Sequence, residues 1–140
     1  MKKIILILIL LIFGIVFLVG CSGNGVIPPP PNDNITRFVG MWFNVDENTN
    51  NIPRVCITEK GDNLAIEVWG ACEPEDCYWG EELVDSTDAL DGVLNVVWVF
   101  SFAEHTQELA IFDDDNLKVT DYVHYTNINL DTERISYFKK

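Results

Sequence analysis

Two cysteines near the middle of the chain, Cys72 and Cys77, are the residues whose type and spacing most directly suggest chemistry. Four residues separate them, and a Trp-Gly pair stands on each side, at Trp69-Gly70 and Trp79-Gly80. Two chemistries fit this arrangement. The cysteines can pair as a disulfide across one loop in an oxidising compartment, or their thiolates can bind a soft metal ion together with a histidine.

The disulfide is the interpretation that we favour for Cys72 and Cys77. Zinc sites usually have closer cysteine pairs and a clear set of four ligands, whereas the two histidines, His105 and His124, stand far along the chain. We therefore expect a structural clip between two strands, worth about 2 kcal/mol in the chain-entropy model. We expect no resident metal ion and no cofactor.

Residues for acid–base catalysis are few. The sequence contains no Gly-x-Ser-x-Gly elbow, no His-Glu-x-x-His motif and no phosphate-binding loop, so we predict no catalytic residues. Asp121 falls on the same face of a predicted strand as Val119 and Val123, and its carboxylate should therefore point into the core. There it would bond Arg54, Arg134 or a tyrosine, or it would contact a ligand.

The N-terminal sequence predicts export from the cytoplasm. Lys2 and Lys3 precede an apolar run over residues 4–19, which is the pattern of a signal peptide and is shorter than the ~20 residues of a comfortable membrane span. The run ends Leu18-Val19-Gly20-Cys21, which resembles a bacterial lipobox. We expect residues 1–20 to be a lipoprotein signal peptide and Cys21 to be the acylated, palmitate-bearing residue; an uncleaved anchor helix is the alternative.

Residues 21–34 have the composition of a tether. Four consecutive prolines at 28–31 favour a polyproline II rod, and Gly and Asn residues flank them. We expect a spacer between a membrane and a folded domain over residues 35–140. The predicted location is the extracytoplasmic face of the cell membrane or outer membrane, held by the lipid on Cys21.

The net charge of the chain limits the classes of partner that it can bind. The chain has 22 acidic and 9 basic residues, a net charge of −13, which becomes −15 if Lys2 and Lys3 leave with the signal peptide. Such a surface is repelled by nucleic acid and by anionic headgroups, so we expect no nucleic-acid partner. Besides the membrane, we expect a small molecule or a basic protein partner.

Short apolar or alternating runs, separated by turn residues, fill the chain after residue 35. This pattern is typical of an all-β domain. The predicted strands cover residues 38–45, 54–59, 64–69, 78–84, 93–102, 107–112, 117–124 and 133–138. The run 93–102 is apolar on both faces, which predicts a central strand or one covered by a second layer, and residues 103–106 read as a turn.

Eight consecutive strands with short connections predict an antiparallel up-and-down meander that closes into a barrel. A two-sheet β-sandwich built from the same strands is the alternative. Cys56 lies in the second predicted strand, where we expect a free, packed thiol; an intermolecular bridge through it is the alternative.

The first predicted strand contains Gly40, Trp42 and Asn44. Glycine followed by tryptophan at +2 resembles the first strand of lipocalins, and the asparagine at +4 is similar to avidin-type barrels. The resemblance implies a barrel whose tryptophan closes one end of the core; it covers five residues, and no biotin site carries over. The candidate ligand or barrel-mouth residues are Trp42, Asn44, Trp69, Trp79 and Asp121.

A longer resemblance covers about 45 residues of the domain. The segment Trp42-Phe43-Asn44-Val45-Asp46, Arg54 and the stretch 69–80 resemble a family of uncharacterised secreted bacterial proteins with the pattern Trp-x-Asn-x-Asp, then Trp-Gly-x-Cys-His-Pro-x-Asp-Cys-x-Trp-Gly. Here Glu73 replaces the histidine. The resemblance implies a fold and a secreted compartment, and it supplies no activity.

We therefore expect a membrane-anchored lipoprotein that works as a non-catalytic ligand-binding barrel. The alternative is a structural or protein-interaction lipoprotein of the cell envelope with a fully packed interior.

Overall fold

The structure is a computed structural model that describes residues 33–113 and 116–140. The predicted signal peptide, Cys21 and the proline run therefore lie outside the described residues. Within the described part, no helix has the length and apolar character required to cross a membrane.

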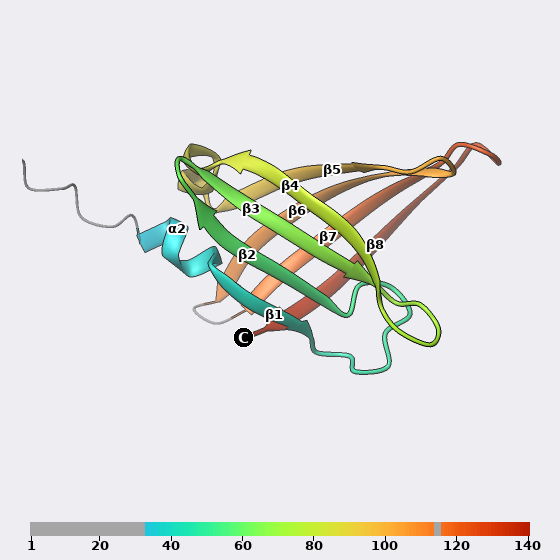
Figure 1. Cartoon of the computed structure of the whole chain (residues 1–140), viewed down its shortest axis with the longest axis horizontal. Coiled ribbons are helices and arrows are strands. Elements are labelled where there is room, and N and C mark those ends of the chain that lie inside the picture. The colour runs from blue at the N-terminus through green and yellow to red at the C-terminus, as the bar shows by residue number, and fades with distance from the viewer. Residues whose placement is uncertain (1–32, 114–115) are drawn as a thin grey trace, which may run out of the picture.

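The described chain contains a short helix, a 3-10 helix and eight strands (Figure 1). The helices are α2 (Asp33–Phe38) and η2 (Ser86–Asp91). The strands are β1 (Gly40–Asn44), β2 (Arg54–Lys60), β3 (Asn63–Gly70), β4 (Cys77–Asp85), β5 (Val93–Val99), β6 (Ala103–Asp113), β7 (Asn116–Tyr125) and β8 (Leu130–Lys139).

All eight strands form one sheet, in the order β4-β3-β2-β1-β8-β7-β6-β5, and every neighbouring pair is antiparallel. The sheet curls into a nearly closed barrel, so the predicted eight-stranded antiparallel barrel is confirmed and the sandwich alternative is wrong. The barrel has a seam: among the described residues, no ladder of paired residues joins β4 to β5.

The barrel consists of two four-stranded meanders. Residues 40–85 make β1 to β4, and residues 93–139 make β5 to β8. Only two register pairs, Phe43 with Lys139 and Asn44 with Phe138, join the halves through β1 and β8. On the opposite side, side chains rather than backbone bonds hold the halves together across the seam.

One end of the barrel is closed. Helices α2 and η2 contact each other there, and Asn34 Nδ2 donates to the Leu90 carbonyl at 3.0 Å. The η2 segment starts at the cap residue Asp85, whose carboxylate accepts from the backbone N–H of Thr87 at 2.8 Å, and ends at Gly92 with a φ of 77°. Beneath these helices lies an apolar core that includes Phe38, Trp42, Ile57, Leu64, Leu94, Leu109, Leu117 and Phe138.

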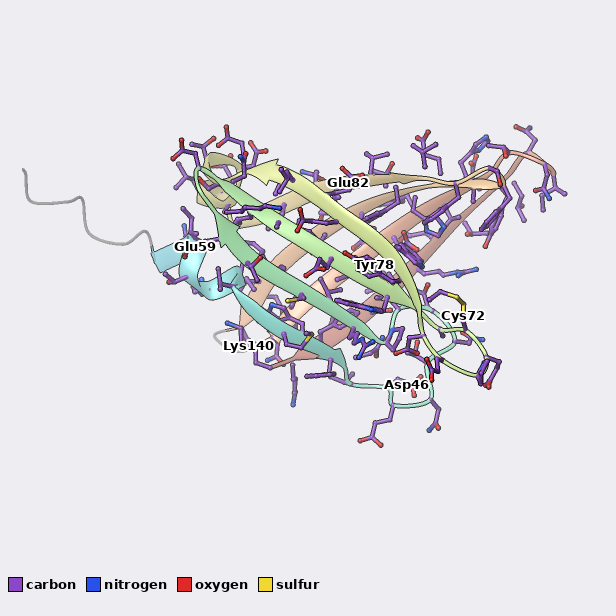
Figure 2. The ribbon with its side chains drawn as sticks, viewed as in Figure 1. Asp46, Glu59, Cys72, Tyr78, Glu82 and Lys140 are labelled. Atoms are coloured by element: carbon purple, nitrogen blue, oxygen red, sulfur yellow. A yellow bond between two sulfur atoms is a disulfide. The ribbon has the colours of Figure 1, made fainter. Side chains whose placement is uncertain are left out.

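The other end is open and carries the longer loops. The strands alternate in direction, so the β1–β2, β3–β4, β5–β6 and β7–β8 connections all lie at this end, on the right of Figure 1. Tyr78 and Cys72, labelled in Figure 2, lie toward this end, and Glu59 lies toward the closed end. The interior becomes polar here, because the inward positions of β6 and β7 include His105, Gln107 and Asp121.

The prediction that residues 93–102 form a central strand is wrong, because β5 is an edge of the sheet. Leu94, Val96 and Trp98 face inward and are buried, but Val97 and Val99 are exposed to solvent, Val99 by 74%. β-Branched residues fit an extended backbone whether or not they are buried, and their presence on the outer face did not require a covering layer.

The prediction of a turn over residues 103–106 is also wrong. The chain turns earlier, between Val99 at the end of β5 and Ala103 at the start of β6. The Phe100 N–H donates to the Ala103 carbonyl at 2.8 Å in this turn. A similar shift occurs at the start of the domain, where Phe38 ends α2 instead of opening the first strand.

Candidate functional site

A cavity of about 380 Å³ occupies the open end of the barrel. Every one of the four loops or hairpins at that end contributes to its wall. We call this cavity the mouth; its lining residues are Asn50, Asn51, Gly70, Ala71, Cys72, Cys77, Tyr78, Trp79, Phe100, Phe102, His105, Tyr125 and Arg134.

Aromatic rings form the wall of the mouth at the seam. The ring of Trp79 in β4 packs edge to face against Phe100 and against Trp98 of β5, with ring centroids 5.3 Å and 6.1 Å apart. Phe102 stacks on Phe100 at 5.8 Å. Such contacts combine large apolar area with defined geometry, so they join the two halves where backbone pairing is missing.

A β-bulge directs Trp79 into the mouth. Val68 pairs with Gly80 and Trp69 pairs with Tyr78, which leaves Trp79 as the extra residue on β4. An extra residue re-aims the side chains around it. Gly70 makes room for the indole: a Cβ added at Gly70 would overlap Nε1 of Trp79.

His105 and Asp121 form a buried pair at the floor of the mouth. The imidazole Nδ1 lies 3.0 Å from Oδ2 and 3.1 Å from Oδ1 of Asp121, and the two residues are 6% and 1% exposed. The carboxylate oxygens accept hydrogen bonds, and we assign the proton that joins the pair to Nδ1. Among the described residues, Nε2 of His105 has no hydrogen-bond partner and remains free for a ligand.

Gln107 lies one inward position deeper on β6 and is fully buried. Its Oε1 accepts from the indole N–H of Trp98 at 3.0 Å, and this bond fixes the orientation of the amide. Nε2 of Gln107 has no hydrogen-bond partner within the described part of the chain. A buried unfilled donor is uncommon in proteins, and it leaves this polar layer able to bond one further acceptor.

Arg134 lies opposite Asp121 in the β7–β8 register, yet its guanidinium bonds elsewhere. Nη2 donates to the Tyr125 hydroxyl at 2.9 Å, and Nη1 donates to Oδ1 of Asn51 at 3.4 Å. The Asp121 carboxylate therefore bonds His105, and the prediction of an arginine or a tyrosine as its partner is wrong. Arg134 instead links the two halves at the rim of the mouth.

Backbone hydrogen bonds order the remaining rim. The Ala71 N–H donates to the Asn51 carbonyl at 2.8 Å, which joins the β1–β2 and β3–β4 loops. The Thr126 N–H donates to the Phe102 carbonyl at 3.0 Å, which joins the β5–β6 and β7–β8 turns. The mouth is thus preformed as two loop pairs, one from each half of the barrel.

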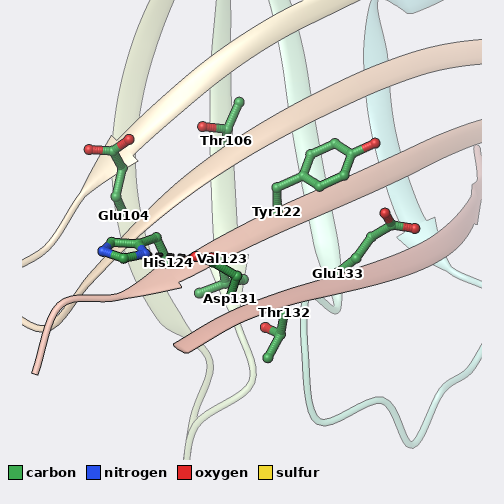
Figure 3. A pocket seen from close by; sticks show the side chains of 8 residues that line it. All are labelled: Glu104, Thr106, Tyr122, Val123, His124, Asp131, Thr132 and Glu133. Atoms are coloured by element: carbon green, nitrogen blue, oxygen red, sulfur yellow. Dashed lines mark hydrogen bonds and ion pairs between the residues drawn. The ribbon is translucent and has the colours of Figure 1, made fainter. Parts of the chain in front are cut away.

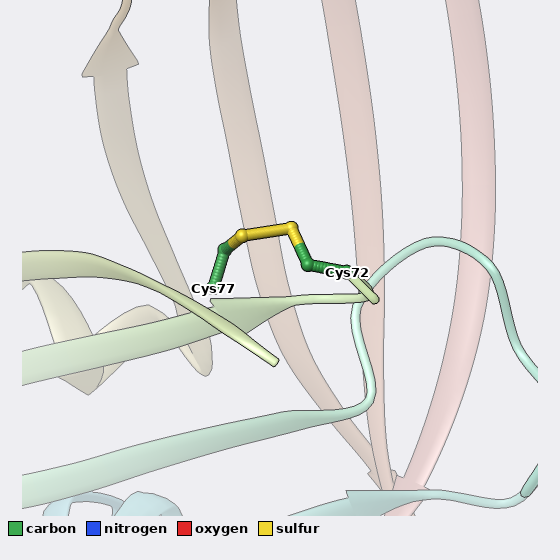
Figure 4. Close-up of a disulfide and its surroundings, with 2 residues drawn as sticks. All are labelled: Cys72 and Cys77. Carbon is green, nitrogen blue, oxygen red and sulfur yellow. A yellow bond between two sulfur atoms is a disulfide. The ribbon is translucent and has the colours of Figure 1, made fainter. Parts of the chain in front are cut away.

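The Cys72–Cys77 disulfide closes the β3–β4 loop (Figure 4), so the predicted clip is confirmed. The two Cα atoms are 5.6 Å apart. Oxidation consumes both thiols, and the alternative of a soft-metal site on these cysteines is therefore wrong. Across the described residues, no group of three or more His, Cys, Asp or Glu side chains is arranged to hold a metal ion.

Comparisons with protein-family models, with curated proteins and with solved structures find no match.

Of the five candidate mouth residues, the structure brings Trp79 into the wall and Asp121 beneath the floor. Trp42 is placed elsewhere: it is fully buried toward the closed end, where its indole donates to the Phe38 carbonyl at 2.7 Å and the Lys140 ammonium lies 4.6 Å from the ring centroid. It packs the core, and its placement at the mouth was wrong.

Asn44 and Trp69 also lie outside the mouth. Asn44 orders the β1–β2 loop by donating to the Ile52 carbonyl at 2.8 Å and accepting from the Asp46 N–H at 2.9 Å. Trp69 lies on the outer face of β3, where Arg54 stacks 4.7 Å from its ring and Tyr78 packs at 5.2 Å. The bulge explains why the two Trp-Gly pairs differ.

The mouth residues that sequence reasoning missed include His105, Arg134, Asn51, Tyr125, Phe100 and Phe102. A signal for His105 existed, because two-residue steps back from the apolar Leu109 reach Gln107 and then His105. The predicted free thiol is present at Cys56, half-buried on β2. Burial raises the pKa of this thiol, and the Glu67 carboxylate raises it further; both effects disfavour the thiolate.

A second hollow of about 410 Å³ lies on the outer face of β6, β7 and β8 (Figure 3). Within it, His124 Nδ1 lies 2.7 Å from Oδ1 of Asp131. Glu104 and Glu133 flank this pair. All four side chains are exposed to solvent, so this hollow is a solvated outer surface rather than a desolvated site.

Proposed function

We propose that this chain is a lipid-anchored, extracytoplasmic binding module whose barrel mouth holds a small ligand. The observation that carries the proposal is the mouth: a cavity of about 380 Å³ with walls from both halves of the barrel. Small-molecule sites are concave, largely apolar and of ~300–1,000 Å³. The opposite end is packed and covered by α2 and η2, so one end is available for binding.

The chemistry of the wall supports binding rather than catalysis. Aromatic rings supply apolar area, and His105, Tyr125, Asn51 and Arg134 supply a few polar groups. A histidine paired with a carboxylate is also an arrangement for general-base catalysis. However, no serine or threonine is among the described lining residues, and both cysteines there are oxidised, so the described wall offers the imidazole neither an aliphatic hydroxyl nor a free thiol to activate.

The lipid anchor belongs to the same proposal. It is supported by the lipobox-like sequence that ends at Cys21 and by the proline run that follows it. We expect Cys21→Ser to abolish incorporation of labelled fatty acid and to release the protein from the membrane fraction. Cys56→Ser is the matched control and should change neither. Equal fatty-acid labelling of the Cys21→Ser variant would overturn the anchor.

A structural or interaction lipoprotein is the second candidate, and the outer face of β1 and β8 favours it. Met41, Phe43, Ile135 and Tyr137 are all exposed there, and exposed apolar groups that gather on one face mark interaction sites. The net charge of −13 would favour a basic partner on such a surface.

Native mass spectrometry of the protein purified from the envelope of cells that make it separates these functions. We expect an added small-molecule mass that disappears on denaturation. Ala71→Trp should fill the mouth and remove the added mass, whereas Val97→Trp, exposed on the outer face of β5, should retain it. If neither the unmodified protein nor either variant carries an added mass, the packed, structural alternative is favoured.

A further inference from the structure

The mouth has an unusual charge composition for this chain. The sequence carries 22 acidic residues and a net charge of −13, yet no described residue that lines the mouth is acidic. The two lining residues that can carry charge are Arg134 and His105, and both charges are positive. The Asp121 carboxylate beneath the mouth is buried and bonded to His105.

The guanidinium of Arg134 is positioned to receive an anion. Its bonds to Tyr125 and Asn51 hold the group at the rim, and both of those partners also line the mouth. Neither partner is charged, and no carboxylate of the described residues lies within ion-pair distance of Arg134. A guanidinium offers five N–H donors in a planar fork that matches a carboxylate, so donors remain for a ligand.

The ring contacts define the other part of the site. Trp79, Phe100 and Phe102 form a continuous aromatic wall, and Trp79 also lies 4.7 Å from the imidazole of His105. Aromatic walls bind flat apolar rings by stacked or edge-to-face packing. A ligand that touches this wall and Arg134 spans both halves of the barrel.

We propose that the ligand of the mouth is a small aromatic anion. Its ring lies against Trp79, Phe100 and Phe102, and its anionic group, a carboxylate or a group of similar shape, bonds Arg134. This inference rests on the proposed binding function and names the class of ligand that the function requires.

The acidic exterior does not prevent anion binding at this place. Charges are screened over a Debye length of about 8 Å at physiological ionic strength, so carboxylates on distant strands act weakly in the mouth. Glu73, Glu75 and Asp76 belong to the loop between the lining residues Cys72 and Cys77, and their charges oppose an anion at that side of the rim. The guanidinium contacts the ligand directly, and a charge-assisted hydrogen bond at contact distance is stronger than a screened charge farther away. The acidic exterior instead weakens nonspecific binding of anions elsewhere on the protein.

The test uses two probes of the same shape, 2-naphthoate and the neutral 2-naphthamide. Each is titrated by calorimetry into the full chain in zwitterionic nanodiscs, with empty nanodiscs subtracted. We expect the naphthoate to bind more tightly. Arg134→Gln should weaken naphthoate about ten- to a hundredfold and leave naphthamide unchanged, whereas Lys139→Gln, an equal loss of charge on the same strand, should change neither affinity.

A second variant separates the ring from the charge. Phe102 is about half exposed, so Phe102→Ser should fold, and it should weaken both probes equally. Equal affinity for both probes, with Arg134→Gln matching Lys139→Gln, would overturn the anionic class and leave the binding function intact. If neither probe binds the unmodified protein beyond empty nanodiscs, and Ala71→Trp retains any co-purified mass, both the ligand class and the mouth as a binding site are wrong.

Discussion

The carboxylate of Asp121 holds the imidazole of His105 across the β6–β7 pair, with Nδ1 3.0 Å from Oδ2. Both residues are buried, so each satisfies a polar group that would otherwise be costly to bury. Replacing one partner should therefore cost more than the loss of one exposed hydrogen bond.

We expect Asp121→Leu to lower the free energy of unfolding by about 1–3 kcal/mol, because it leaves a buried N–H without an acceptor. The double variant His105→Phe/Asp121→Leu should be less destabilised than the sum of the single variants, since it removes both polar groups together. Urea unfolding followed by tryptophan fluorescence measures all three. Strict additivity would show that the pair is not coupled.

A second prediction concerns Gly70. The indole of Trp79 occupies the space that a side chain at Gly70 would need, so Gly70→Ala should cost about 1–3 kcal/mol by overpacking and should displace Trp79. Gly61→Ala is the control: Gly61 has a φ of +65° and no atom within 4 Å of an added Cβ.

The two glycine variants should differ in their effect on the site. Gly61→Ala adds backbone strain of about 1–2 kcal/mol at the closed end of the barrel and should leave naphthoate affinity unchanged. Gly70→Ala should change both the tryptophan emission and the affinity. If both variants bind the probe alike, Trp79 does not form the wall of the site.

The third prediction concerns the disulfide. Reduction of Cys72–Cys77, or the double substitution to serine, should lower the free energy of unfolding by about 2 kcal/mol, because the short loop regains conformational freedom in the unfolded chain. Urea unfolding with and without a phosphine reductant measures the change. Cys56→Ser, at a free thiol, should leave the effect of the reductant intact; a reductant effect that disappears with Cys56 would contradict this assignment.

The fourth prediction is a pH dependence at η2. Hydrogen bonds from the backbone N–H of Thr87, and then from its hydroxyl, lower the pKa of Asp85. A carboxyl with a lower pKa in the folded state adds stability above its unfolded pKa of about 3.9. That stability is lost as the pH falls below this value and through the folded pKa.

Asp85→Asn keeps an acceptor at the helix cap but does not titrate. The melting temperature of the unmodified protein should exceed that of Asp85→Asn at neutral pH, and the difference should shrink below about pH 4. Parallel melting curves for the two proteins across that range would show that Asp85 does not contribute through its charge.

The strand pattern was predictable because alternation reports the pleat directly. Leu64, Ile66 and Val68 were placed correctly on one face of β3, and the short connections implied neighbouring antiparallel strands. The seam was not predictable in the same way: Val97 and Val99 have the strand preference of a covered face, although they lie on an exposed edge.

The site was harder to predict because it depends on one inserted residue and on rotamers. The two Trp-Gly pairs look equivalent in the sequence, but the bulge at Trp79 turns one indole inward and leaves Trp69 outside. The partner of Asp121 was also undetermined. Register places Arg134 opposite Asp121, and only the side-chain conformations reveal that His105 binds the carboxylate instead.

The division of the barrel into two meanders has a thermodynamic consequence for ligand discovery. Two register pairs of β1 with β8 join the halves of the barrel. A ligand in the mouth would contact both halves, so its binding would be linked to closure of the barrel. A ligand at one hundred times its Kd adds about 2.7 kcal/mol to the stability of the native state, and each kcal/mol raises the Tm of a domain of this size by about 4–8 °C. Thermal melting across a library of aromatic acids can therefore identify the ligand without any prior assay of activity.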